Sequence, residues 1–182
     1  MARTRLPVLC ALAVMVSAII VPASVSAANW YGTTLIGAPP TNPEPLSPNA
    51  FWERPDGSIW VAQNVSRIGL WSPSGTHLTD VGSVYGTAPG QFQSPVAIAG
   101  SPDGSEMYVL DQGARKVKRH TADGAYTSEW GTAGAAACQF SQPQDLDVAP
   151  DGTVLTIDAG SRWLNRWSAD GSTCLAFDTQ KV

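Results

Sequence analysis

The sequence has few of the residues that most often carry catalysis or bind nucleic acid. It contains 2 histidines, and its 11 lysines and arginines are outnumbered by 15 aspartates and glutamates. The net charge of −4 repels phosphate backbones, so we expect no nucleic-acid partner. His77 and His120 lie in different segments and do not supply the three or four ligands of a zinc site. A serine-hydrolase elbow and a glycine-rich phosphate loop are also missing.

A long apolar run occurs only at the N-terminus. Two arginines precede a mostly apolar stretch over residues 6–21, and the small residues of Val25–Ala27 are typical of a signal-peptidase site. We predict a signal peptide over residues 1–27. The alternative is an uncleaved anchor, although the run is shorter than the roughly 20 apolar residues of a spanning helix. Cleavage would give an exported chain, either secreted or periplasmic, with no membrane contact beyond the signal peptide.

Cysteine is almost absent beyond that segment, where Cys138 and Cys174 are the two that remain. An even number of cysteines in an exported chain is typical of a disulfide. We predict a bridge between them, which would close a loop of about 36 residues and add about 3–4 kcal/mol on the chain-entropy account. Two free thiols in a cytoplasm would require the signal-peptide prediction to be wrong.

The sequence also lacks helical periodicity after residue 28, and in its place it has a repeat of 47–48 residues. The segment Phe140–Trp167 (FSQPQDLDVAPDGTVLTIDAGSRWLNRW) repeats Phe92–His120 (FQSPVAIAGSPDGSEMYVLDQGARKVKRH). The initial Phe, the Pro three residues later and the Asp-Gly pair recur at a spacing of 48. A weaker copy, Ser47–Gly75, lies one period upstream. Three copies at this period indicate a repeat architecture rather than a single active-site segment.

Each copy has the pattern of four short antiparallel strands. Alternating or β-branched stretches are separated by turns of the Asp-Gly type, which favour hairpins. In the third copy the predicted strands are residues 144–148, 153–157, 162–167 and 172–177. Four strands per repeat of this length describe a propeller blade. We therefore expect an all-β fold, a β-propeller with about three four-stranded antiparallel blades, at residues 47–85, 86–131 and 132–182.

Two stretches resemble the NHL repeat: Gly90–Gly113 (GQFQSPVAIAGSPDGSEMYVLDQG) and Cys138–Gly160 (CQFSQPQDLDVAPDGTVLTIDAG). The family pattern has Gly-x-Phe-x-x-Pro, an apolar strand, then Asp-Gly and a second strand that ends in Asp. The first copy lacks the Phe and has Gln63 where the others have Asp111 and Asp158, and all three lack the customary Asn after that position. The resemblance implies a propeller, commonly of six blades, and implies little about activity because propellers host many functions.

Three blades are too few to close a propeller, which needs about four to eight. Either the sequence is part of a larger product, or two copies of three blades form a six-bladed ring. Residues 28–46 are interpreted as the outer strand of an otherwise absent blade followed by a Pro-rich lead-in. An open arc would expose the apolar faces of its end blades, so we expect no stable lone monomer. Those faces are expected to include Ile59, Val61, Val154, Leu155 and Ile157.

Four aspartates are candidates for binding a ligand or a cation. Asp111 and Asp158 occupy equivalent places after the second strand, where a ring of carboxylates could hold Ca²⁺ or a polar ligand. Their recurrence favours a turn-capping role instead. Asp145 and Asp147 replace alanines of the second copy and share one strand face. They could bind a cation or act as acid and base, although a solvated strand face is the favoured alternative.

Aromatic and basic residues give two further predictions. Trp30 and Trp52 lie near predicted loops and are candidates for a contact surface, whereas the tryptophans of predicted strands are expected to pack between blades. The basic run Arg115–His120 is interpreted as a solvated strand face.

We therefore predict an exported NHL-type propeller segment that acts as a non-enzymatic binding or scaffold module. Its partner would be a protein, a peptide or a carbohydrate, and self-association could complete a propeller. No cofactor is expected for this function. The alternative is a propeller enzyme of the lyase or lactonase kind that uses a cation such as Ca²⁺ in the central channel, which strong binding of Ca²⁺ or Zn²⁺ would indicate.

Overall fold

The computed structural model describes residues 47–63 and 66–180, and this part of the chain folds into twelve β-strands without a helix. No helix long and apolar enough to cross a membrane therefore occurs among these residues. The predicted signal peptide, the lead-in over residues 28–46 and Trp30 lie outside the described residues. The strands are β1 Pro48–Glu53, β2 Ile59–Gln63, β3 Arg67–Trp71, β4 His77–Val81, β5 Pro95–Gly100, β6 Glu106–Asp111, β7 Lys116–Thr121, β8 Tyr126–Trp130, β9 Pro143–Val148, β10 Val154–Asp158, β11 Trp163–Trp167 and β12 Cys174–Asp178.

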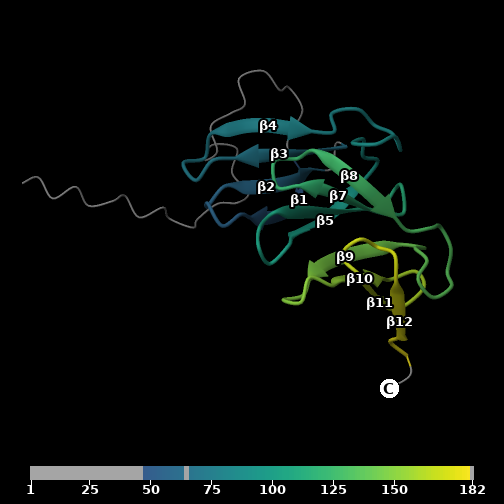
Figure 1. The fold of residues 1–182 in the computed structure, drawn as a ribbon. Helices are drawn as coiled ribbons and strands as arrows, with labels where there is room; N and C mark the ends of the chain where they lie inside the picture. Colours follow the sequence, from purple (N-terminus) through teal and green to yellow (C-terminus); the bar gives the residue numbers. More distant parts are fainter. Residues whose placement is uncertain (1–46, 64–65, 181–182) are drawn as a thin grey trace, which may run out of the picture. The chain divides into compact units, whose positions relative to one another are not determined.

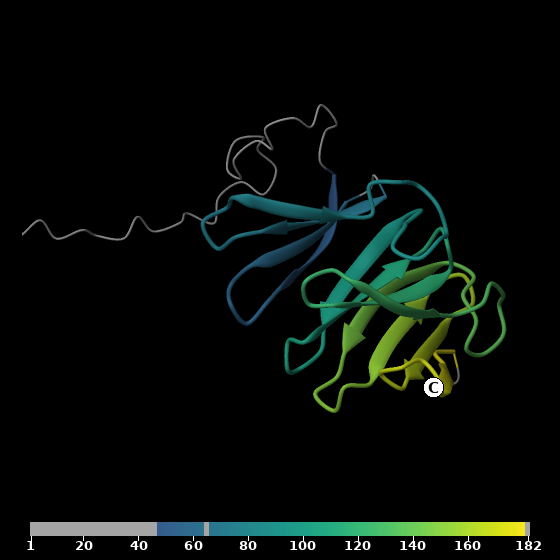
Figure 2. The same cartoon turned by 45° about the horizontal axis from the view of Figure 1, so that its top comes forward.

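The strands form three four-stranded antiparallel sheets, each built from four consecutive strands (Figure 1). We call β1–β4 blade 1, β5–β8 blade 2 and β9–β12 blade 3. Figure 2 shows blade 1, in blue, as a separate group of ribbons beside blades 2 and 3, which overlap in this view. The blades contact one another chiefly through their first strands, β1 against β5 and β5 against β9. The predicted all-β fold of three four-stranded blades is confirmed, and the strands of the third copy lie within two residues of their predicted positions.

The hairpins form where the sequence places Asp-Gly. In the first hairpin of blade 2, the backbone N–H of Ser105 donates to the carboxylate of Asp103 at 3.1 Å. Gly104, between them, has a φ of +71°, which glycine adopts without steric cost. The same arrangement, with a backbone N–H donating to the Asp two residues earlier, recurs at Asp56, Asp151 and Asp170.

Two apolar cores lie between the blades, and blade 2 contributes to both. Along β6 the side chains alternate, with Met107 and Val109 in the core shared with blade 1, and Tyr108 and Leu110 in the core shared with blade 3. This burial on both faces explains why the middle of β6, residues 107–110, is continuously apolar, whereas a strand with one solvated face would alternate.

A buried phenylalanine precedes the first strand of blades 2 and 3. Phe92 and Phe140 have no exposed surface, and each lies against a glycine that follows the fourth strand of the preceding blade. A Cβ atom on Gly82 would come 2.8 Å from the Phe92 ring, and one on Gly131 would come 2.6 Å from the Phe140 ring. The Phe of the repeat pattern therefore packs on a position of the preceding blade where only glycine leaves room for its ring. We call this position the phenylalanine socket.

Two expectations about exposure are wrong. The basic run is not a solvated face, because Lys118 and His120 on β7 are fully buried under the loop that carries Phe92. The apolar residues of the end blades are also not all exposed. Val154 packs into the core with blade 2, and Val61 is buried.

Candidate functional site

Asp158 joins blade 3 to the loop that leads into it. Its carboxylate is fully buried and accepts hydrogen bonds from the backbone N–H groups of Ser141 at 2.6 Å, Gln142 at 3.1 Å and Ser161 at 2.7 Å. Burial acts to raise the pKa of Asp158, but the donors at Ser161, Gln142 and Ser141 outweigh it and lower the pKa below its usual value. The carboxylate is thus held ionised by protein donors.

Asp111 makes the equivalent clamp in blade 2. Its carboxylate is buried and accepts the backbone N–H groups of Gln93 and Ser94, both at 2.9 Å. The ammonium of Lys118, itself fully buried, lies 3.3 Å from the same carboxylate and also donates to the carbonyl of Gln91. Both recurring aspartates therefore lie in the interior with their oxygens bonded to the protein, as expected of residues that hold a blade together.

The other two candidate aspartates lie on the surface. Asp145 and Asp147 are exposed on β9, and each accepts a hydrogen bond from the next backbone N–H, at 2.9 and 2.8 Å. Register places Asp145 opposite Ile157 and Asp147 opposite Leu155, so all four share one sheet face. Among the described residues no group of three or more His, Cys, Asp or Glu side chains could hold a metal ion.

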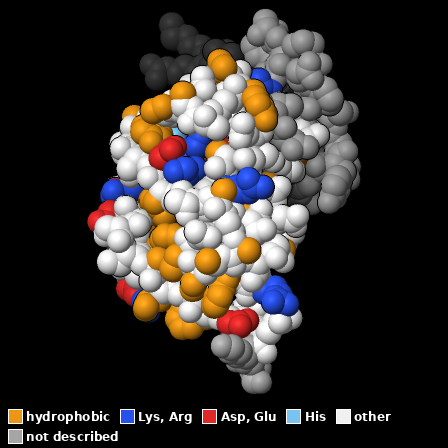
Figure 3. Space-filling view, turned by 90° about the vertical axis from the view of Figure 1, so that its right-hand side faces the viewer, with side chains coloured by type: hydrophobic (Ala, Val, Ile, Leu, Met, Phe, Trp, Pro, Cys, Tyr) orange, Lys and Arg blue, Asp and Glu red, His pale blue; other side chains and the backbone are white. Residues whose placement is uncertain are grey.

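The face that Asp145 and Asp147 share is the side of blade 3 turned away from blade 2. We call it the trailing face of blade 3. Three of its side chains are markedly exposed: Ile157 at 49%, Leu175 at 64% and Phe177 at 51%. Figure 3, which views the molecule from the side where blade 3 lies in Figure 1, shows hydrophobic side chains gathered over the lower half of that view. The apolar residues of the trailing face are Leu155, Ile157, Leu164, Leu175 and Phe177.

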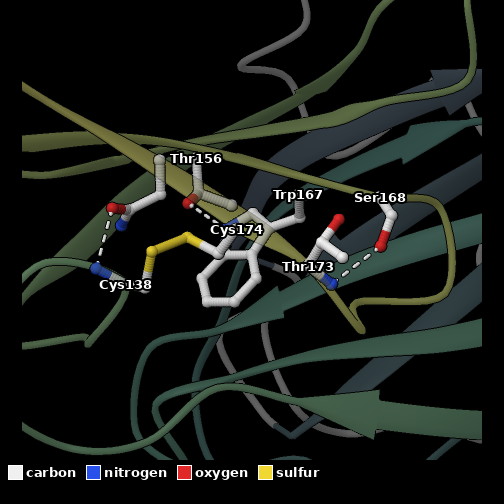
Figure 4. The surroundings of a disulfide bond; sticks show 7 residues. Cys138, Thr156, Trp167, Ser168, Thr173 and Cys174 are labelled. Atoms are coloured by element: carbon white, nitrogen blue, oxygen red, sulfur yellow. Dashed lines mark hydrogen bonds between the residues drawn. A yellow bond between two sulfur atoms is a disulfide. The ribbon is translucent and has the colours of Figure 1, made fainter.

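The opposite face of blade 3 is anchored to the rest of the protein. The predicted disulfide is present: Cys138 in the entry loop is bonded to Cys174 on β12, with Cα atoms 6.1 Å apart (Figure 4). Beside it the indole N–H of Trp167 donates to the hydroxyl of Thr156 at 3.1 Å. The trailing face is therefore presented by a sheet that is cross-linked on its other side.

Trp52, the other candidate for surface contact, is half-buried. Its indole packs against the core between blades 1 and 2 and lies over Gly100 of β5, where a side chain would collide with it. Trp52 as a whole is of intermediate exposure, so it is neither a free surface aromatic nor a fully buried one.

One polar feature was not anticipated from the sequence. A cleft of about 410 Å³ between the turns of blades 2 and 3 is lined by residues that include Asp103, Glu106, Tyr108 and Asp151. Glu106 accepts the Tyr108 hydroxyl at 2.7 Å and the Nε of Arg119 at 2.9 Å. Burial, followed by the bond to Glu106, raises the pKa of Tyr108. The available signal was Glu106 itself, the one residue that the second copy has in addition to the third.

No protein-family model and no curated protein sequence matches the chain. Solved structures do match it. The WD40 repeats of RRP9 align with a TM-score of 0.62 and 16% identity over 77% of this chain and 41% of theirs. A streptogramin B lyase aligns at 0.57 and 18% over 76% and 42%. The virginiamycin B lyase of Staphylococcus aureus aligns at 0.58 and 18% over 74% and 42%.

The chain thus spans about two fifths of the length of these solved structures. At such low identity the likeness concerns the fold alone. Together with the three sheets, it shows a partial β-propeller of about three blades.

Proposed function

We propose that the chain is an exported NHL-type propeller segment that acts as a non-enzymatic binding module, and that its contact surface is the trailing face of blade 3. One observation carries the proposal. Leu155, Ile157, Leu164 and Phe177 occupy the same sheet positions as Tyr108, Leu110, Val117 and Trp130 of blade 2. The four residues of blade 2 are buried by blade 3, whereas Ile157 and Phe177 are about half exposed.

An apolar sheet face of this kind favours a protein or peptide partner. Monomeric soluble proteins seldom expose contiguous apolar patches larger than a few hundred Å², and larger ones mark interaction sites. Phe177 and Leu175 stand out from the patch and would be its anchors in an interface. A carbohydrate partner would instead use the hydroxyls and carboxylates of the cleft near Glu106.

Export is supported by the disulfide, because such bonds persist in oxidising compartments. Processing after Ala27 is tested by the intact mass of the protein recovered from the culture medium or periplasm. We expect a chain that begins at Ala28 and gains about two mass units on reduction. A cell-associated chain that starts at Met1 would contradict export.

The alternative function, a lyase or lactonase that uses a cation, draws on the exposed carboxylates of Asp145 and Asp147. Two of the matched structures are lyases, but that likeness concerns the fold. Titration calorimetry of the full chain with CaCl₂ and with ZnCl₂ separates the two functions. The binding module predicts no saturable heat, whereas tight binding that Asp145→Asn abolishes would favour the enzyme.

Site-specific photo-crosslinking tests the binding surface directly. A benzophenone amino acid placed at Leu175 should give discrete adducts when the exported protein is irradiated in its native medium. The same group at Ser74, in an exposed polar turn of blade 1, is the control and should give none. Equal labelling at both positions, or none at Leu175, would contradict a specific contact at the trailing face.

A further inference from the structure

The trailing face of blade 3 departs from the repeat in three ways, and each bears on what can cover it. The first departure is on β9, the first strand of the blade, which we call its inner strand. Asp145 and Asp147 stand where blade 2 has Ala97 and Ala99, on the face toward the following blade. Blades contact each other mainly through these inner strands. A following blade would therefore bury two carboxylates that each accept one hydrogen bond, from the next backbone N–H, and this costs far more than burying alanines.

The second departure closes the phenylalanine socket. The register places Asp178 at the position of Gly82 and Gly131. Asp178 continues β12 opposite Trp163, and the next residue, Thr179, donates its hydroxyl to the carbonyl of Arg162 at 2.9 Å. A Cβ at the glycine position collides with the incoming ring in blades 1 and 2. Blade 3 therefore lacks the socket that receives the Phe of a next NHL-type blade.

The third departure extends the apolar surface outward. Leu175 on β12 stands opposite Arg166, at the position that Thr79 holds in blade 1 and Ser128 in blade 2. A polar residue suffices there between blades, but Leu175 is 64% exposed. The face is thus polar at its inner strand and apolar over β10, β11 and β12, which moves the centre of any contact to β11.

The outward face of blade 1 does not offer a matching surface for a head-to-tail ring. Its central side chains Val61, Gln63 and Trp71 are already buried, although Phe51 at the edge is exposed. A second copy that docked blade 1 on blade 3 would therefore find little free apolar surface at the centre of that face. The trailing face of blade 3 offers such surface in both copies.

We propose that the trailing face of blade 3 pairs with the same face of a second copy, about a two-fold axis along β11. The inference rests on the proposed binding function and names its partner. The cross-strand rows of side chains on this face determine which residues of the two copies would contact each other. In one row Ile157, Leu164 and Phe177 are neighbours, and in the next Leu155 and Leu175 flank Arg166. Rotation about β11 places each β12 over the partner's β10.

In this arrangement Phe177 packs on Ile157 of the second copy, and Leu164 packs on its own counterpart at the axis. Asp145 and Asp147, on β9, extend past the partner's edge and stay in water. The guanidinium of Arg166 lies near the axis with its charge balanced by Asp151, at 2.5 Å. The result has an apolar row at its centre, with the two copies of Arg166 beside it, and a polar rim.

The area of the face indicates how tightly the two copies would bind. Three strands about 4.8 Å apart and five residues long, at about 3.3 Å per residue, project about 240 Å². With protruding side chains this is about 500 Å² of accessible surface per copy, so about 1,000 Å² in total, which is below the roughly 1,200–2,000 Å² of stable interfaces and in the range of weak ones. We therefore expect a dimer that dissociates in the micromolar range.

Cysteine cross-linking tests both the dimer and its axis in the exported protein with its native disulfide. Leu164→Cys lies on the two-fold, where stacked sheets are about 10 Å apart, too far for a direct disulfide, so a short bismaleimide of about 8 Å reach should join the two thiols into a covalent dimer at about 50 µM. Asp147→Cys, on the same face but beyond the overlap, is the matched control and should stay mostly monomeric. Equal cross-linking of the two variants, or none at Leu164→Cys, would overturn the proposal.

Sedimentation of the unmodified protein supplies a second readout. The weight-average mass should rise toward twice the monomer mass between 1 and 100 µM, and Phe177→Lys should abolish the rise while its near-ultraviolet dichroism stays native. If Phe177→Lys fails to fold, the comparison of Leu164→Cys with Asp147→Cys still tests the dimer. A weight-average mass equal to that of the monomer at all concentrations would contradict the self-pairing. A different protein captured at Leu175 in the photo-crosslinking would leave the binding function standing.

Discussion

His120 should make the stability of the protein fall between about pH 6.5 and pH 4, a range that begins well above the pKa of ordinary carboxylates. Its imidazole is fully buried, with ring centroids 5.6 Å from Phe92 and 5.7 Å from Tyr126. Among the described residues neither ring nitrogen makes a hydrogen bond of good geometry, although the backbone of Lys118 lies close enough to interact with the imidazole. Burial lowers the pKa of His120 to about 4, and together with the nearby charge of Lys118 it outweighs that backbone interaction, which acts to raise the pKa.

The sign follows from which state binds the proton. Above about pH 6.5, the usual pKa of an unfolded histidine, both states are neutral and His120 makes no pH-dependent contribution. Between pH 6.5 and pH 4 the unfolded chain takes up a proton that the folded protein does not, so the free energy of unfolding falls with pH. A pKa of about 4 in the folded protein gives a loss of about 2 kcal/mol by pH 5 and about 3 kcal/mol by pH 4.

Urea unfolding followed by tryptophan fluorescence, at 1 µM and in steps from pH 7.5 to pH 4, measures this loss. His120→Phe is the control, because it keeps an aromatic ring between Phe92 and Tyr126 but has no proton to bind. The carboxylates of Asp103 and Asp170, whose pKa values hydrogen bonds from Ser101 and Ser168 lower to about 2, lose their contribution only below about pH 3.8. Equal slopes for the two proteins between pH 6.5 and pH 4.5 would refute the reasoning.

Three other changes probe the scaffold, each by urea or thermal unfolding of the variant beside the unchanged protein. Replacing Cys138 and Cys174 by Ser should cost about 3–4 kcal/mol, because a loop of about 36 residues is released; an unchanged midpoint would contradict it. Asp158→Ala should cost about 3 kcal/mol or more by leaving three buried N–H donors unpaired, and a loss below about 1 kcal/mol would show that water replaces the carboxylate. Gly131→Ala should cost clearly more than Gly152→Ala, since both have positive φ but the Gly152 position is open, so equal losses would rule out a steric socket.

The sequence could predict what local chemistry determines. The Asp-Gly pairs set the hairpins through the carboxylate of Asp103 and its equivalents, and the period of 47–48 residues set the number of blades. The disulfide was predictable because two cysteines allow a single pairing. The burial of Lys118 and His120 was not, because it depends on Phe92, which reaches β7 from a loop that precedes β5. A basic strand gives no sign that its cover comes from elsewhere in the chain.

The candidate site shows a related limit. Recurrence in the sequence distinguishes Asp111 and Asp158 from Asp145 and Asp147, but it does not say which pair is buried and which is exposed. A residue that recurs in each blade meets the same neighbours in each, and Asp111 and Asp158 both hold the loop that enters their own blade. The residues of blade 3 that differ in type from their counterparts in the other blades lie close to one surface. Asp147, Leu175 and Asp178 all border the trailing face of blade 3, where a following blade would have needed Ala, a polar residue and Gly. Three departures on one surface are hard to explain by the packing of a further blade, whereas the proposed pairing with a second copy would account for all three.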